Sequence, residues 1–190
     1  MESLEGPVSR SASSSAFVEL YERHQRHVYA YCRRRVSPDV VDDAVADVFL
    51  AVWRRIAEVP GEPQVRPWLY RVAYLTLTNH WRSAARRRNL SARLEAFGVS
   101  SGVSVPDQIV VREEVREALA LLANLRPSDR EIIRLAVWEE LSHAEMALVL
   151  GVSENTVRQR LFRAKKRLGD EYEKHQDTSV TPAAEKGGER

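Results

Sequence analysis

The 190-residue sequence has few of the features that mark secreted, membrane or disulfide-rich proteins. Cys32 is its one cysteine, which excludes an internal disulfide framework. No apolar run approaches the roughly 18 residues that a membrane-spanning helix requires. The N-terminus also lacks the apolar stretch of a signal peptide. We therefore expect a protein of a reducing compartment, the cytoplasm, with no membrane insertion.

The sequence also lacks convincing runs of alternating apolar and polar residues, so an all-α fold is expected. The Ser-rich start and the Pro- and Gly-containing end have no helical periodicity, which predicts disordered tails at residues 1–16 and 174–190. Gly, Ser and Pro cluster again at 89–111, which predicts a flexible linker. Two small helical domains remain, at residues 17–88 and 112–173.

Charge is unevenly distributed, although the formal net charge is only +2. Five arginines and no acid occur from Trp81 to Arg93, whereas the segment from Asp42 to Asp47 is acidic. Different surfaces of the protein are therefore expected to contact different partners.

The acidic segment belongs to a predicted helix that begins at Ser37, as N-cap, and Pro38. Its apolar residues recur at helical spacing, and Asp42, Asp43 and Asp47 fall outside that stripe. Acids near a helix N-terminus can be a solvated surface favoured by the helix dipole. They can equally form a surface on which a partner docks, and the pattern alone leaves both explanations open.

A third helix, predicted to begin at Pro67, combines arginines with aromatic rings. Guanidinium groups neutralise phosphates, and flat rings stack on unpaired bases for about 1–3 kcal/mol each. The helix is therefore a candidate surface for single-stranded nucleic acid. Alternatively, the rings fill the core of a small domain and the arginines interact with the helix dipole. The residues concerned are Trp68, Tyr70, Tyr74, His80, Trp81, Arg82, Arg86, Arg87 and Arg88.

The second domain contains a predicted helix-turn-helix. Ser142 and Glu145 form a capping-box pattern, Gly151 suits the tight turn that closes this helix, and Ser153 can cap the next one. The following helix has a buried stripe at spacings of four, three and four: Val157, Leu161, Ala164 and Leu168.

The other side of that helix carries side chains suited to a DNA major groove. Arg can pair with guanine bidentately, Asn and Gln can pair with adenine, and Lys can contact phosphates. An inert or protein-binding helix is the alternative. The candidate DNA-contacting residues are Glu154, Asn155, Thr156, Arg158, Gln159, Arg160, Arg163, Lys165 and Lys166.

Two long segments, "RPWLYRVAYLTLTNHWRSAARR" and "LRPSDREIIRLAVWEELSHAEMALVLGVSENTVRQRLFRAKKRL", together resemble the sigma-70 family of RNA polymerase sigma factors, extracytoplasmic-function group. The resemblance runs from about Phe17 to Leu168. It implies that the first domain binds the clamp helices of the largest subunit of core RNA polymerase and melts the −10 promoter element. The second domain would read the −35 element as duplex, with the polymerase flap as a further contact. An anti-sigma factor is a usual partner in this family.

The resemblance also nominates residues. "DDAVADVFLAVW" is similar to the family's polymerase-docking helix, and "TNHWRSAARR" is similar to its −10 helix. The loop "VPGEPQVRP" takes the place of the loop that holds a flipped-out −10 base, although it departs from the more usual Phe-Arg-Gly type. The candidates are Asp43, Asp47 and Trp53 for polymerase binding, and Asn79, Arg82, Arg86 and Arg87 for the −10 element.

Other classes of function are less well supported by the sequence. A stand-alone DNA-binding regulator would leave the first domain without a role. A nuclease-like enzyme would need metal-binding carboxylates, and no ligand set matches the acids of the second predicted helix. His24, His27 and Cys32 do not share one helical face, which disfavours a zinc site. We therefore expect no catalytic residues, no cofactor, no metal and no small-molecule substrate.

Overall fold

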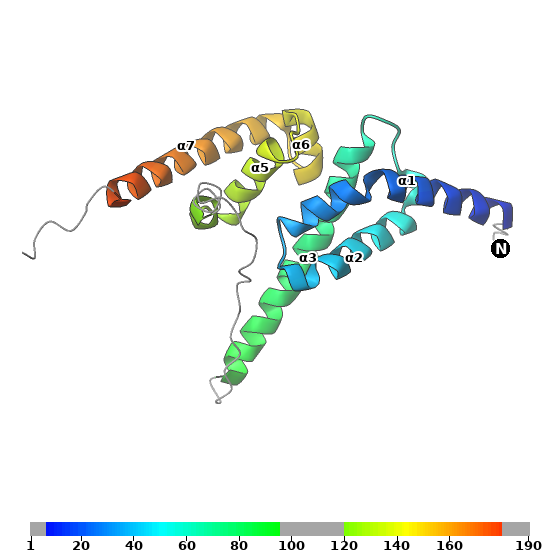
Figure 1. The fold of residues 1–190 in the computed structure, drawn as a ribbon, viewed down its shortest axis with the longest axis horizontal. Helices are drawn as coiled ribbons and strands as arrows, with labels where there is room; N and C mark the ends of the chain where they lie inside the picture. Colours follow the sequence, from blue (N-terminus) through cyan, green and yellow to red (C-terminus); the bar gives the residue numbers. More distant parts are fainter. Residues whose placement is uncertain (1–6, 96–119, 180–190) are drawn as a thin grey trace, which may run out of the picture. The chain divides into compact units, whose positions relative to one another are not determined.

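The structure, a computed structural model, describes residues 7–95 and 120–179. These residues contain helices and no strands, so the all-α prediction is confirmed. The chain divides into two compact units, and the main boundary between them in the sequence falls near residue 108 (Figure 1). Residues 96–119, which include most of the segment predicted as a linker, lie outside the described residues.

The first unit is built from three long helices and two short 3₁₀ turns. Each pair of long helices packs together (Figure 1). Their shared core includes stacked rings of Tyr31 and Tyr70, with centroids 5.0 Å apart. The elements are α1 (Pro7–Arg33), η1 (Pro38–Val40), α2 (Val41–Arg54), η2 (Ile56–Glu58) and α3 (Val65–Glu95).

Helices α1 and α3 are longer than the sequence pattern indicates. α1 begins at Pro7, inside the segment 1–16 predicted as a tail, and α3 continues to Glu95, past the start of the segment predicted as a linker. Once a helix is nucleated by packing, each further residue adds one hydrogen bond, so polar Ser- and Arg-rich ends can continue it. Apolar periodicity detects only the packed part of such a helix.

The helix starts also differ from those predicted. The side-chain oxygen of Ser37 makes no capping hydrogen bond, and Pro38 opens a 3₁₀ turn before α2 begins at Val41. α3 begins at Val65, two residues ahead of Pro67. A proline is tolerated there because the N–H groups of the first turn have no partner within the helix.

Most of the chain after residue 108 forms the second unit. The described elements of this part of the chain are a helical segment at residues 120–124, then α5 (Pro127–Val137), α6 (His143–Leu150) and α7 (Glu154–Ser179). α5 packs along α7. α7 extends beyond residue 173, into the segment predicted as the C-terminal tail. Arg130 of α5 donates hydrogen bonds to the carbonyl oxygens of Leu122, Ala123 and Leu125, and so caps the end of the preceding helical segment.

Candidate nucleic-acid and partner interfaces

The turn between α6 and α7 is fixed by local hydrogen bonds. The Ser142 N–H donates to Glu145 Oε2 at 2.8 Å, and the Glu145 N–H donates to Ser142 Oγ at 3.3 Å, which is the predicted capping box. Gly151 has a φ of 66°, a conformation that glycine adopts without a Cβ penalty. Ser153 Oγ accepts from the Thr156 N–H at 3.2 Å and caps α7. The start of α6, the turn and the start of α7 are therefore fixed by interactions between residues that are close in the sequence.

α7 has a buried side and an exposed side. Val157, Leu161 and Ala164 of the predicted stripe are buried, and Leu168 is half-buried. Thr156 is half-buried too, with its hydroxyl 2.8 Å from Ser153 Oγ. The other predicted DNA-contacting side chains are exposed: Glu154, Asn155, Arg158, Gln159, Arg160, Arg163, Lys165 and Lys166.

Phe162 belongs to the exposed side of α7 and was not predicted to act there. Its residue surface is 72% exposed. It follows Gln159 by three positions and precedes Lys166 by four, so all three lie on one helical face. The signal was present in the sequence, because Phe162 falls outside the stripe that begins at Val157.

Ion pairs orient Arg158 and Arg167, two of the basic side chains of α7. Arg158 donates to Glu154 at 2.8 Å across one exposed turn. Arg167 donates to Asp129 at 2.5 Å, and Asp129 is buried at the start of α5. A carboxylate shielded from water interacts with its partner more strongly than an exposed one. The second pair therefore sets how α7 lies against α5.

In the first unit, the outward side of α2 carries the acids nominated for polymerase binding. Asp43 and Asp47 are exposed, and Leu50, 46% exposed, lies on the same helical face. We call these three residues the docking face. Trp53 packs edge-on against Phe17 of α1, with centroids 5.2 Å apart, and is only partly available to a partner. Leu50 was not predicted to act there, although its spacing from Asp43 and Asp47 places it outside the apolar stripe of α2.

α3 carries the −10 candidates where it leaves the core. Among its described side chains, which end at Arg82, the last buried one is Leu77. Asn79, Trp81 and Arg82 are exposed, while Arg86 and Arg87 follow in the helix, with side chains outside the described set.

The aromatic residues of α3 divide between the two roles considered above. Tyr70 is buried, so its ring belongs to the core. Trp68 is half-buried beneath the Arg55 guanidinium, 5.6 Å from its centroid, and Tyr74 is also half-buried. Trp81 is exposed and available to stack on a base.

A cavity of about 240 Å³ lies between α1 and the loop that precedes α3. His24 in its wall is only 6% exposed, and its Nδ1 atom has no hydrogen-bond partner. His24 Nε2 is 3.7 Å from Glu62 Oε1. Burial lowers the pKa of His24 below its usual value, which favours the neutral ring. We call this the loop cavity; its lining is Ala16, Glu19, Leu20, Arg23, His24, Val59, Pro60, Gly61, Glu62 and Val65.

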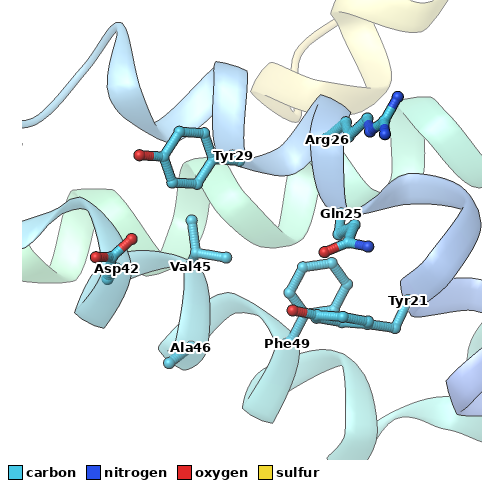
Figure 2. A pocket seen from close by; sticks show the side chains of 8 residues that line it. All are labelled: Tyr21, Gln25, Arg26, Tyr29, Asp42, Val45, Ala46 and Phe49. Carbon is cyan, nitrogen blue, oxygen red and sulfur yellow. The ribbon is translucent and has the colours of Figure 1, made fainter.

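A larger open groove of about 650 Å³ runs between α1 and α2 (Figure 2). Figure 2 shows Tyr29 and Asp42 toward one end and the rings of Tyr21 and Phe49 toward the other, with Val45 between. Gln25, Arg26 and Ala46 complete the lining. The apolar floor and the half-exposed tyrosines suit an apolar side chain presented by a partner. We call it the α1–α2 groove.

Within residues 7–95 and 120–179, none of the helices combines the length and the apolar character that a membrane span needs. Nor do any three His, Cys, Asp or Glu side chains in residues 7–95 and 120–179 gather as a metal ion requires, and Cys32 is a buried free thiol.

Comparison with protein families gives a match to each unit. Residues 20–87 match Sigma-70 region 2, and residues 116–168 match Sigma-70, region 4. The chain is 31% identical over 157 residues to RNA polymerase sigma factor NccH of Alcaligenes xylosoxydans xylosoxydans, covering 80% of this chain and 84% of the relative. It is 27% identical over 172 residues to the ECF RNA polymerase sigma-E factor of Escherichia coli K12, covering 86% of this chain and 90% of the relative.

Solved structures share the fold. The sigma factor RpoE of Bartonella quintana, in complex with the anti-sigma factor NepR, matches with a TM-score of 0.62 and 18% identity, covering 83% of this chain and 96% of that one. CnrH, in complex with the cytosolic domain of CnrY, matches with a TM-score of 0.57 and 24% identity, covering 85% and 94%.

Proposed function

The chain belongs to the sigma-70 family of RNA polymerase sigma factors, extracytoplasmic-function group, and from that premise we propose how its surfaces divide the work. The protein binds core RNA polymerase and directs promoter-specific initiation of transcription. In the proposal, residues 17–88 bind polymerase and the −10 element, and residues 112–173 bind the −35 element. Residues 89–111 link them. The protein acts in the cytoplasm, without a catalytic site.

The exposed side of α7 is the proposed −35 reader. The observation that carries this assignment is the division of α7 into a buried stripe and an outward side rich in Arg, Asn and Gln. The capped turn at Gly151 presents the first turns of α7, which enter the groove in helix-turn-helix proteins. Phe162 extends the proposed surface with an apolar contact.

The exposed end of α3 is the proposed −10 binder. Asn79 and Arg82 are exposed beyond the core, with Trp81 between them as a stacking ring. Replacing Arg82 and Arg86 with Ala should reduce the permanganate reactivity of unpaired promoter thymines more than it reduces polymerase binding. Unaltered melting would return these arginines to the role of a solvated helix end.

The loop cavity is the proposed site for a base that leaves the duplex. Its volume admits one base, and Leu20, Val59 and Val65 supply apolar walls. Glu62 offers an acceptor, and the neutral ring of His24 can offer a donor, 3.7 Å apart. That pair complements the amino group and adjacent ring nitrogen of cytosine or adenine. Guanine and thymine would place a carbonyl oxygen against the carboxylate.

A Glu62→Gln variant tests the base assignment. The amide offers both a donor and an acceptor, so keto bases should become tolerated at one −10 position while polymerase binding is kept. The measurement is initiation from promoters carrying each base at each −10 position. An unchanged preference at every position would remove Glu62 from base selection.

The docking face is the proposed contact for the clamp helices of polymerase, with Asp43 and Asp47 opposite basic groups and Leu50 as an apolar centre. The α1–α2 groove adjoins it through Ala46 and is the proposed site for a helix of an anti-sigma factor.

Reconstitution with purified core polymerase and a promoter library tests the whole proposal. A stand-alone regulator would bind promoter DNA but would not make core polymerase initiate.

A further inference from the structure

The segment of α3 proposed to bind the −10 element begins where the helix leaves the core. Among the α3 side chains that the structure describes, which end at Arg82, Leu77 is the last buried one, and the helix itself continues to Glu95. Figure 1 shows the later part of α3 extending beyond α1 and α2. A helix that projects from a core is positioned by its own stiffness and by contacts near the point where it leaves the core.

One such contact is a hydrogen bond between His80 and Asp47. His80 Nε2 is 2.8 Å from Asp47 Oδ2, and the two residues are 33 positions apart in the chain. His80 follows Leu77 by about one turn and lies beside Asn79. Asp47 belongs to the docking face on α2. The bond therefore joins the surface proposed for polymerase to the helix proposed for the −10 strand.

We infer that His80 is a positioning residue that couples polymerase binding to −10 binding. The inference rests on the functions proposed above for α2 and α3. His80 engages Oδ2 and fixes the rotation of the Asp47 carboxylate, so that Oδ1 is presented to a cation of the polymerase. The bond needs a proton on Nε2, which the charged ring and one neutral tautomer both supply. By linkage, a polymerase cation that holds Asp47 also holds His80 and the base of the arginine-bearing helix end.

Both side chains are partly exposed, 39% for His80 and 52% for Asp47, so the bond is of moderate strength. A hydrogen bond to a charged group in such a setting corresponds to an affinity change of about threefold to tenfold. That range is measurable without unfolding the unit, because the side chains in the core beneath are untouched.

The experiment measures the affinity of fluorescently labelled full-length protein for core polymerase without DNA, and then open-complex yield at saturating polymerase. His80→Ala should weaken the affinity about threefold to tenfold and lower the open-complex yield. His80→Gln, whose amide N–H reaches about as far as Nε2, should restore both to within about twofold. His27→Ala, which removes an exposed histidine of α1, is the matched control and should change neither.

A double-mutant cycle separates positioning from a general structural effect. His80→Ala should cause no further loss of affinity in an Asp47→Ala background. Additive losses, a wild-type affinity for a folded His80→Ala variant, or a failure of Gln to restore binding would each overturn the inference. Should His80→Ala lose helical circular dichroism, His80→Leu keeps the bulk without the donor and replaces it in the cycle.

The same data distinguish this inference from the proposed docking face. A loss of affinity in Asp47→Ala with no effect of His80 overturns the coupling alone. An unchanged affinity in both Asp43→Ala and Asp47→Ala overturns the docking face itself.

Discussion

Removal of the Phe162 ring should separate promoter reading from folding. The residue is 72% exposed in the free protein, so roughly a quarter of the about 2–3 kcal/mol available from burying a Phe side chain is already gained on folding. Phe162→Ala should therefore lower the free energy of unfolding by only about 0.5–0.7 kcal/mol. Leu161→Ala, at a position 6% exposed, should cost about 2–5 kcal/mol.

The exposed area of the Phe162 ring also determines how much affinity for DNA should be lost when the ring is removed. A contact that covers about half of the remaining ring is worth about 1 kcal/mol, or about fivefold in affinity. An apolar ring in the major groove is suited to the C5-methyl group of thymine. Promoters in which deoxyuridine replaces thymine within the −35 element lose only that methyl group, so the wild type should initiate about fivefold less well when the contacted thymine is replaced.

The assay compares initiation by core polymerase with wild type and Phe162→Ala on this set of thymine and deoxyuridine promoters. The variant should no longer distinguish thymine from deoxyuridine at that position. Tyr172→Ala, which removes another exposed ring of α7 beyond the turn-proximal half, is the matched control and should keep the distinction. A Phe162→Ala variant that still discriminates the methyl group, or that loses more than about 2 kcal/mol of stability, would refute the reasoning.

Three further outcomes are expected. Charge reversal of Asp43 and Asp47 to Arg should reduce co-purification with core polymerase by more than about tenfold, because two favourable charges become repulsive, while circular dichroism stays helical. Arg158→Ala should change which −35 sequences are preferred, at a cost of about 1–3 kcal/mol at one position, whereas Lys165→Ala should weaken all sequences alike and lower the salt slope by about one. The folded state lowers the pKa of His24, so the unfolded chain binds a proton more readily; the melting temperature should fall as pH decreases from about 7 to about 5, and less so in His24→Gln.

The parts of the site that depend on neighbouring residues were predictable from the sequence. The capping box of Ser142, the cap at Ser153 and the positive φ of Gly151 are specified within four residues, and all three are present in the structure. The buried stripe of α7 follows from the same short-range spacing. The prediction that Ser37 caps the second helix was wrong, because a 3₁₀ turn that begins at Pro38 precedes α2.

The parts that depend on distant residues were not predictable. His24 and Glu62 line one cavity, and Asp47 and His80 share a hydrogen bond, only because α1, α2 and α3 pack together. No periodicity in the sequence encodes these pairs. Leu50 differs from these pairs, because its spacing from Asp43 and Asp47 already places it outside the apolar stripe of α2, and its exposure was therefore predictable.

Because α7 has a buried side and an outward side, the protein's promoter preference can change in evolution without a change in its ability to fold. The outward side chains bury little area in the free protein, so changes there are nearly neutral for stability. Val157, Leu161 and Ala164 remain constrained by the core. A lineage that carries this fold can therefore acquire new target promoters by substitution on one face of one helix, and a designer can retarget it in the same way.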